Sequence, residues 1–238
     1  MKLSRVCIGL ATLAVGLLIL SGPLTRFGLV HFRTGLLLFA GALLVAIASF
    51  TVSAVALMVP RLRGDRGRSF AVALGLSLVV MAGPAVFVQK ARGVPAIHDI
   101  TTDTENPPQF VDVIAQRAAQ GAMNPPEYSG AEVARQQKQA YPDIAPLDLG
   151  IPAPEAFVRA AAVARSMGFE VVAENVQEGR IEATATTAWF GFKDDIVIRV
   201  APTSSGARID VRSKSRVGRS DVGANAARIR AYLAAVRG

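Results

Sequence analysis

Four cations gather near the C-terminus, in the segment RSKSRVGRSDVGAN (residues 212–225), and form the strongest candidate for a binding site. The sequence predicts that a helix begins directly after them, with Ser220 as its N-cap and Asp221 in its first turn. Free backbone amides at a helix N-terminus attract anions, so a phosphate, a lipid headgroup or an acidic partner could bind there. The alternative is a capped helix beside a solvated basic strand, because Asp221 repels an anion. The candidate binding residues are Arg212, Lys214, Arg216 and Arg219.

The segment WFGFKDD (residues 189–195) holds the only tryptophan of the chain and is expected to form the tip of a β-hairpin. Gly191 permits an unusual backbone angle, and the aspartates favour a turn. The aromatic side chains could also line a ligand pocket or lie at a bilayer surface, where such rings are favoured. These candidate contact residues are Trp189, Phe190 and Phe192.

Acid–base chemistry has one candidate, in the segment HDITTDTENPP (residues 98–108). His98 with Asp99 or Asp103 could act as a general acid–base pair in a hydrolase. The alternative is a polar connector whose side chains bond to the local backbone. The sequence contains no nucleophile elbow, which favours the connector.

Metal and cofactor chemistry has little support in the sequence. Asp194 and Asp195 are weak candidates for binding a hard cation such as calcium, because adjacent aspartates alone do not have the spacing of a metal site. The only cysteine, Cys7, lies in an apolar segment, so zinc-site and cysteine-nucleophile chemistry are not expected. No phosphate-binding loop or dinucleotide fingerprint is present. We therefore predict no cofactor and no metal.

Three apolar stretches are long enough to cross a bilayer as helices, which requires roughly 20 residues. They cover about residues 6–24, 35–59 and 69–89. No small-x-small cleavage site follows the first stretch, so we expect a retained anchor and not a signal peptide. The stretches carry no charged residue, which favours an anchor over an ion carrier.

The basic excess of the chain lies beside these apolar stretches. Residues 1–92, the expected membrane anchor, hold ten Lys or Arg and one acidic residue, a net charge of +9, whereas the remaining 146 residues carry a net charge of −1. Basic residues in this position set membrane topology, so the high isoelectric point does not indicate a nucleic-acid partner. Four arginines in the loop RLRGDRGR favour an inside location for that loop and for the N-terminus. Three spans then place residues 93–238 outside, in the periplasm of a bacterium whose inner membrane holds the anchor.

The sequence predicts an α+β fold outside the membrane. Residues 93–152 are rich in proline and are expected to form a connector with short helices at 109–119 and 130–140. Residues 153–238 are expected to form an α-β-β-β-β-α domain, an antiparallel sheet with both helices on one face. The other face is polar, and is either a solvated, ion-paired surface or the seat of a partner. The four strands are expected at 169–174, 180–188, 195–201 and 207–213.

Five segments carry a family resemblance over roughly residues 95–236. They are HDITTDTENPP, NPPEYSG, AYPDIAPL, GRIEATATTAWFGFKDDIVIRV and RIDVRSKSRVGRSDVGANAARIRAYL. In these segments the chain resembles a bacterial family catalogued as domain of unknown function 1499, whose similar members also carry apolar N-terminal segments. The resemblance implies a domain boundary after the anchor and implies no particular reaction.

Three functional hypotheses are compatible with these patterns. The leading one is a membrane-anchored, periplasm-facing module that binds another envelope protein or an anionic lipid through the four cations and the hairpin aromatics. The second is an envelope hydrolase that uses His98. The third is a structural subunit of a larger membrane complex.

Overall fold

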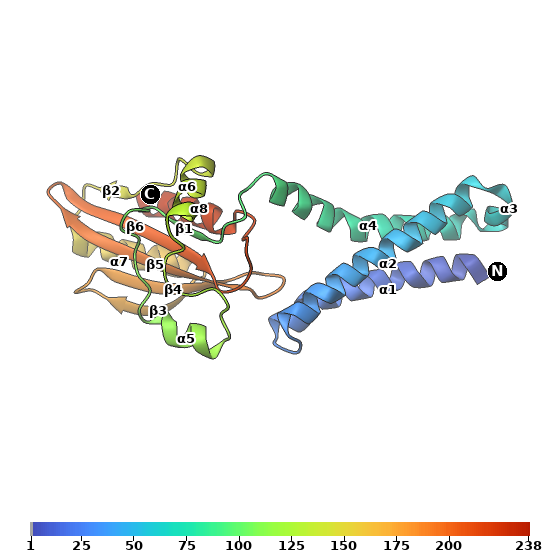
Figure 1. The fold of residues 1–238 in the computed structure, drawn as a ribbon, viewed down its shortest axis with the longest axis horizontal. Helices are drawn as coiled ribbons and strands as arrows, with labels where there is room; N and C mark the ends of the chain where they lie inside the picture. The colour runs from blue at the N-terminus through green and yellow to red at the C-terminus, as the bar shows by residue number, and fades with distance from the viewer. Residues whose placement is uncertain (1) are drawn as a thin grey trace. The chain divides into compact units, whose positions relative to one another are not determined.

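A computed structural model describes residues 2–238, and the chain divides into two compact units. Unit 1 runs as far as Lys90 and also includes Ala188–Gly191, whereas unit 2 comprises Ala91–Thr187 and Phe192–Gly238. Unit 1 is built from helices and unit 2 contains the sheet (Figure 1).

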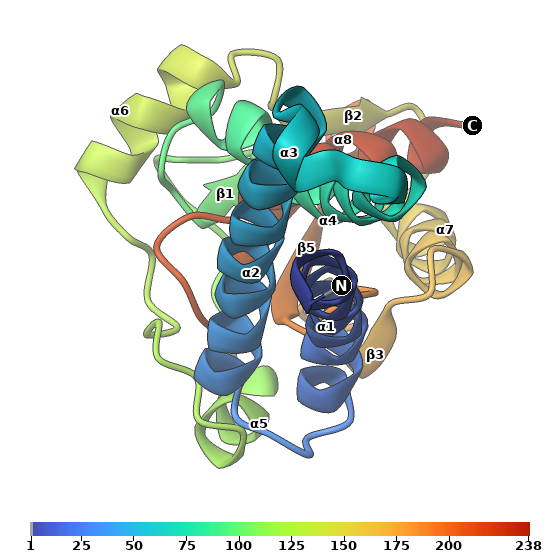
Figure 2. The same cartoon turned by 90° about the vertical axis from the view of Figure 1, so that its right-hand side faces the viewer.

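Unit 1 contains three long helices joined by short connections. They are α1 (Lys2–Arg26), α2 (Phe32–Met58) and α4 (Gly67–Arg92), and the short helices α3 (Pro60–Arg63) and η1 (Gly64–Arg66) link the last two. The first two helices lie side by side in both views (Figures 1 and 2). By length and composition, three helical segments are candidates to cross a membrane. The predicted apolar N-terminal helices are thereby confirmed.

Small residues fill the contacts between these helices. Cys7 of α1 is buried in one cluster with Ala56 of α2 and Ala73 of α4, beside the larger ring of Phe70. The Ser49 hydroxyl in α2 donates to the Cys7 carbonyl oxygen at 3.0 Å. Small side chains let helix backbones approach closely, whereas large apolar side chains such as Leu37 remain exposed. The helices therefore present an apolar exterior that suits a bilayer.

Unit 2 is built on a six-stranded sheet. Its helices are α5 (Val113–Ala119), α6 (Ala131–Ala140), α7 (Ala153–Ser166) and α8 (Ala224–Arg237). Its strands are β1 (Asp99–Thr101), β2 (Leu147–Leu149), β3 (Glu170–Asn175), β4 (Arg180–Thr186), β5 (Lys193–Thr203) and β6 (Gly206–Ser215). The strand order is β1-β6-β5-β4-β3, β2 also pairs with β6, and every pairing is antiparallel. The predicted α+β fold with an antiparallel sheet is confirmed.

Two short strands lie within residues 93–152, where the sequence predicts a connector with two short helices. Both helices are present, as α5 and α6, but β1 and β2 also pair with successive parts of β6. Asp99 lies opposite Lys214, and Leu147 lies opposite Ile209. Three-residue strands are too short to show an alternating pattern, so their formation depends on the free edge that β6 offers. The pairing ties this segment to the sheet.

The helices α7 and α8 close one face of the sheet, as the sequence predicts. Ile181, Ile198 and Ile209 of the strands form one buried cluster with Phe157 of α7 and Ile229 of α8. Both helices lie behind the strands in Figure 1. Burial of this apolar surface is the main force that holds the helices on the sheet.

The last helix begins at Ala224, and the prediction that Ser220 caps it is wrong. The Asp221 carboxylate accepts hydrogen bonds from the backbone amides of Gly223 and Asn225, each at 2.8 Å. Gly223 has a φ of 79°, which glycine adopts without steric cost and which turns the chain into the helix. The carboxylate that stabilises the start of the helix therefore comes from Asp221.

Residues 102–130, which we call the strap, cover the opposite face of the sheet. The strap contains α5 and the loops on either side of it, and it crosses in front of the strands in Figure 1. Its side chains Phe110 and Val113 are buried against Val197 of β5. The sequence predicts a solvated face or the seat of a partner here. The chain itself takes that place, because apolar groups of the strap pack on Val197 while its polar groups pair with the charged strands.

Candidate functional site

Beneath the strap, four cations surround two of the fully buried carboxylates. Asp99 lies in β1 and Asp195 lies in β5, and both have an exposed fraction of 0%. Alternation along a strand directs side chains two residues apart to the same face, which places residues 212 and 214 together. We call the following six residues the cationic cluster. They are Asp99, Arg117, Asp195, Arg212, Lys214 and Arg216.

Asp195 binds two guanidinium groups at once. The Arg216 Nη2 atom donates to Oδ1 at 2.6 Å and its Nε atom donates to Oδ2 at 2.9 Å. Arg117 of α5 donates to Oδ2 through Nη1, and the Thr184 hydroxyl of β4 donates to Oδ1 at 2.8 Å. Hydrogen bonds between charged groups are the strong ones, and a two-point guanidinium contact also fixes orientation. Asp195 thus connects the strap helix to the end of β6.

Asp99 makes the second set of ion pairs. Arg212 donates to its two oxygens through Nε at 2.8 Å and Nη2 at 3.0 Å. The Lys214 Nζ atom lies 3.1 Å from Oδ2. The backbone amide and hydroxyl of Ser129, at the end of the strap, both donate to Oδ2 at 3.0 Å. The carboxylate of Asp99 is therefore surrounded by donors.

The surroundings of Asp99 change its pKa and that of its neighbour. Burial raises the pKa of the Asp99 carboxyl, but the hydrogen bonds and charges of Arg212 and Lys214 outweigh burial and bring the pKa below its ordinary value of 3.8. Burial lowers the pKa of Lys214, and the charge and hydrogen bond of Asp99 offset part of this decrease. Burial likewise lowers the pKa of Arg117, in spite of the opposing charge of Asp195.

The cations also bind the backbone of the strap. Arg212 donates to the carbonyl oxygens of Pro108 and Pro126 at 3.2 and 2.9 Å. Lys214 donates to the carbonyl oxygen of Glu127 at 2.5 Å. Four cations face only two carboxylates, and these carbonyl dipoles supply the remaining negative potential. The cationic cluster thereby holds the strap on the sheet.

Strap residue Asn124 reinforces this attachment from the opposite direction. Its side-chain amide donates to the carbonyl oxygens of Ser215 and Gly218, both at 2.9 Å. Its own carbonyl oxygen accepts from Arg117 Nη2 at 2.7 Å, and its backbone amide donates to the Arg216 carbonyl oxygen at 3.0 Å. One residue of the strap therefore bonds to both the strap helix and the segment after β6.

Aromatic rings enclose the Arg212 side chain. The Arg212 guanidinium carbon lies 4.8 Å from the centre of the Phe110 ring and 5.4 Å from the centre of the Tyr128 ring. Arg117 lies on the same Phe110 ring, at 5.7 Å. Ring faces attract cations, most strongly where water is excluded. Burial and the nearby charge of Asp99 raise the pKa of Tyr128 to about 12, so its hydroxyl is neutral at pH 7.

Glu182 of β4 receives the N-terminus of the strap helix. Its two carboxylate oxygens accept from the backbone amides of Val111, Asp112 and Val113 at 2.8, 3.0 and 3.0 Å. A carboxylate at this position satisfies amides that have no partner within the helix. Arg180 pairs with Glu182 and with Asp112, which links the sheet to the strap a second time.

One known protein family matches the part of the chain that contains the sheet, the strap and the cationic cluster. The family described as protein of unknown function (DUF1499) matches residues 99–236, from β1 to the last turn of α8. The chain belongs to the DUF1499 family. The matched region contains the sheet, the strap and every member of the cationic cluster, so the resemblance seen in the sequence is confirmed. No curated protein matches the chain.

The candidate acid–base residues of the DUF1499 domain are held apart by their own contacts. Asp99 is taken up by Arg212 and Lys214. The His98 ring contacts the Arg219 carbonyl oxygen, with Nδ1 at 3.3 Å. Asp103 accepts from two backbone amides of its own loop and forms an ion pair with Arg199 at 3.1 Å. The structure therefore does not bring His98 together with either carboxylate.

The two adjacent aspartates of the DUF1499 domain point to opposite faces of β5. Asp195 faces the strap, whereas Asp194 pairs with Arg228 of α8 at 2.6 Å on the helical face. Residues 2–238 contain no group of three or more His, Cys, Asp or Glu side chains that could hold a metal ion. Strand alternation thus separates the two weak metal candidates.

Three of the four predicted binding cations are buried, and Arg219 is the exposed one. The hairpin tip contains Trp189, Phe190 and Phe192 as the sequence predicts, but the expectation that the aspartates form part of the turn is wrong, because Asp194 and Asp195 are paired residues of β5. The connection from β4 to β5 covers residues 187–192, and Gly191 has a φ of 70°. Trp189 is 46% exposed, and Phe190 and Phe192 are half-buried. Within unit 1, the Phe190 ring meets the Phe39 ring edge-on, with centroids 5.9 Å apart.

Sequence reasoning missed the residues that attach the strap to the sheet of the DUF1499 domain. The charges on the strands gave one usable indication: Asp195 and Lys214 lie directly opposite each other in the register of β5 and β6. Acids and bases at such positions favour pairing along the face over solvation. The missed residues are Arg117, Asn124, Ser129 and Glu182.

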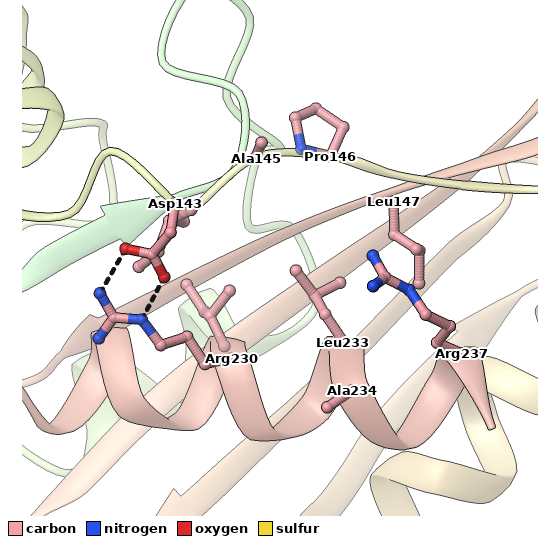
Figure 3. A pocket seen from close by; sticks show the side chains of 10 residues that line it. Asp143, Ala145, Pro146, Leu147, Arg230, Leu233, Ala234 and Arg237 are labelled. Atoms are coloured by element: carbon pink, nitrogen blue, oxygen red, sulfur yellow. Dashed lines mark hydrogen bonds and ion pairs between the residues drawn. The ribbon is translucent and has the colours of Figure 1, made fainter.

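A hollow of about 230 Å³ lies beside α8 of the DUF1499 domain, against residues 143–147 (Figure 3). Ile144, Leu147 and Leu233 line its apolar part. At one end, Arg230 donates to both oxygens of Asp143, at 2.5 and 2.7 Å. The sequence patterns do not single out this surface, because its lining comes from two segments that the fold brings together.

Proposed function

We propose that this protein is a membrane-anchored binding or assembly module of the bacterial inner membrane, with its DUF1499 domain in the periplasm. The helices α1, α2 and α4 form the anchor, and the domain recognises a protein partner or an anionic lipid. Three candidate membrane helices and the basic residues beside them support the anchoring and its direction.

The connection between α2 and α4 supports the proposed orientation. It contains α3 and η1 and carries Arg61, Arg63 and Arg66, followed by Arg68 at the start of α4. Short loops with several arginines remain on the cytoplasmic side. Three crossings from a cytoplasmic N-terminus then put residues 93–238 in the periplasm.

The observation that carries the binding role is that the buried carboxylates beneath the strap are engaged in holding the fold of the domain. Asp99 and Asp195 are saturated by cations, and those cations are in turn bound to the strap. A general base needs a free lone pair directed at a substrate. The arrangement thus favours a rigid domain that presents an outer surface to a partner.

The partner surface lies outside the cationic cluster in this proposal. Arg212, Lys214 and Arg216 act in the fold, where they hold the strap, and leave Arg219 as the accessible member of the predicted anion site. The half-exposed Trp189 adds apolar surface at the hairpin tip. Aromatic and arginine side chains are the residues that most often contribute binding energy at interfaces.

The orientation can be tested by labelling single cysteines in intact cells. Cys7→Ser removes the native thiol, and Ser204→Cys then places one thiol in the exposed turn between β5 and β6. A maleimide that cannot cross the inner membrane is expected to label this variant once the outer membrane is permeabilised. The matched variant Arg63→Cys is expected to be labelled only after lysis. The reverse pattern would contradict the periplasmic placement.

The binding role can be tested by native mass spectrometry of the full-length protein released from its own membranes. We expect a discrete added mass, either a second envelope protein or an anionic phospholipid, and we expect it to persist in the His98→Ala variant. A bare protein that hydrolyses an ester or amide substrate, with activity lost in His98→Ala, would overturn the proposal in favour of an enzyme.

A further inference from the structure

The hollow beside α8 combines an apolar floor with an unpaired cation. Ile144 and Leu147 are buried beneath it, and Leu233 forms part of its wall. At one end, both carboxylate oxygens of Asp143 accept hydrogen bonds from Arg230, so this cation is paired. At the other end, within the described part of the chain, Arg237 makes no hydrogen bond and no ion pair, and it is exposed.

We propose that this hollow binds a segment of a partner protein in which one large apolar side chain lies next to an aspartate or glutamate. The apolar side chain enters between residues 143–147 and α8, and the adjacent carboxylate pairs with Arg237. This inference rests on the proposed binding function and adds to it a site and a class of partner.

The size of the hollow selects a single side chain. Sites for small molecules and cofactors have volumes of about 300–1,000 Å³. The volume here is about 230 Å³, which is too small for such a ligand or for a whole lipid chain. Pockets that receive one anchoring side chain at the centre of an interface contribute much of the binding energy between proteins.

The charges around the hollow favour a carboxylate next to the bound apolar side chain. Asp143 neutralises Arg230, so Arg237 gives the rim a net positive charge. Arg230 and Arg237 are seven residues apart on α8 and therefore lie on the same face, two turns from each other. Figure 3 shows the Arg237 side chain reaching toward Leu147, at the end of the hollow away from Asp143. A carboxylate next to the bound apolar side chain can pair with this guanidinium in a two-point contact.

The test is selection of random peptides displayed on phage against the full-length protein in nanodiscs. We expect enriched peptides to carry Leu, Met, Phe or Trp directly beside Asp or Glu. A synthetic peptide with the enriched sequence is expected to bind at least tenfold more weakly to Ala234→Trp, which fills the hollow, and to Arg237→Glu. Both replaced side chains are exposed, so the domain is expected to remain folded. Ala235→Trp is the matched control, because Ala235 is also exposed but does not line the hollow.

A charge exchange makes the test more specific. The Arg237→Glu variant is expected to recover binding when the acidic residue of the peptide is replaced by Lys. Enriched peptides that bind Ala234→Trp and the parent protein equally, or that carry basic residues beside the apolar one, would overturn the proposal. So would phosphatidylglycerol vesicles that bind in an Ala234-dependent manner while no peptide does, because they would identify a lipid site.

Native mass spectrometry of the same variants distinguishes failure of the proposed site from failure of the general binding role. If the complex detected by native mass spectrometry persists in both Ala234→Trp and Arg237→Glu, the protein binds a partner through another surface. The proposed function then stands and the assignment of the hollow fails. If no complex forms with the parent protein either, the general role fails as well.

Discussion

The two faces of the sheet are closed by different physical means. On one face, α7 and α8 bury aliphatic side chains such as Ile198 against Phe157 and Ile229. On the other face, the strap is held by the cationic cluster, in which Asp99 and Asp195 collect four cations. Apolar burial is non-directional, whereas charged hydrogen bonds demand defined distances and angles. The helical face therefore supplies stability, and the strap face fixes one position of a segment with little regular structure.

The difference also changes how each face tolerates substitution. Shortening an apolar side chain removes contacts and leaves a small cavity, which costs free energy in proportion to the atoms removed. Removing one charge from a buried pair leaves its partner without water and without a counterion, which costs more than the pair contributes.

The largest effect is expected from Asp195→Ala. The change leaves Arg117 and Arg216 buried without their shared carboxylate, and the free energy of unfolding is expected to fall by about 3–5 kcal/mol. Urea denaturation of the full-length protein, followed by circular dichroism, measures the change. The matched control is Asp143→Ala, which removes an exposed ion pair and is expected to cost about 1 kcal/mol or less. Equal losses in the two variants would show that the buried cluster has no special role.

A compensating variant sharpens this prediction. Asp195→Leu combined with Arg117→Met and Arg216→Met replaces the three charges by apolar side chains of similar volume. Such replacements are often neutral or stabilising, so we expect the triple variant to recover most of the stability lost in Asp195→Ala. A triple variant less stable than Asp195→Ala would mean that the directional bonds themselves supply the stability.

Acid is expected to destabilise the strap face. The pKa of Asp99 lies below its ordinary value of 3.8, so in acid the unfolded chain binds a proton more readily than the folded one. The stabilisation by Asp99 is therefore fully present above about pH 3.8 and is lost as the pH falls through the depressed pKa. Denaturation midpoints measured from pH 6 to pH 2 test this. Asp99→Asn is expected to be less stable at pH 6 and to lose less stability on acidification. An identical acid dependence in the variant would contradict the assignment.

A smaller loss is expected from Asn124→Ala. The variant lacks the two side-chain hydrogen bonds to the Ser215 and Gly218 carbonyl oxygens. At about 0.5–1.5 kcal/mol for each bond, the free energy of unfolding is expected to fall by about 1–3 kcal/mol. Limited proteolysis should show faster cleavage within the strap. Unchanged cleavage would mean that Asn124 does not hold the strap.

The smallest effect is expected on the helical face, from Ile198→Val. This change removes one methylene group from a fully buried side chain and is expected to cost about 0.5–1.5 kcal/mol. Cleavage of the strap should be unaffected apart from the global loss of stability. A loss larger than that of Asp195→Ala would reverse the comparison of the two faces.

The sequence predicts the helical face and the strands well, because both have strong periodic patterns. Phe157 and Ala161 mark one face of α7, and Ile209 alternates with charged neighbours in β6. The membrane helices follow from their length and lack of charge. The start of α8 is misplaced because Ser220 and Asp221 are both good capping residues, and backbone geometry decides between them.

The strap and its ion pairs could not be predicted from local patterns. Asp99 and Arg212 are 113 residues apart, and Arg117 and Asp195 are 78 residues apart. A polar strand face has the same sequence pattern whether water or another segment covers it. The proline-rich composition of residues 93–152 indicates an irregular backbone, and an irregular segment can be either a free connector or a tightly bound strap. Only the tertiary structure distinguishes these alternatives.

Hydrogen exchange of the full-length protein in nanodiscs tests most directly whether the strap is an integral layer of the domain. The relevant probe is the backbone amide of Val113, which Glu182 binds at 3.0 Å, compared with amides in the centre of β5. We predict that both exchange only through global unfolding, with the same free energy of opening. Fast exchange at Val113 with full protection in β5 would show that the strap opens by itself, and would contradict the assignment of the buried cations to the fold.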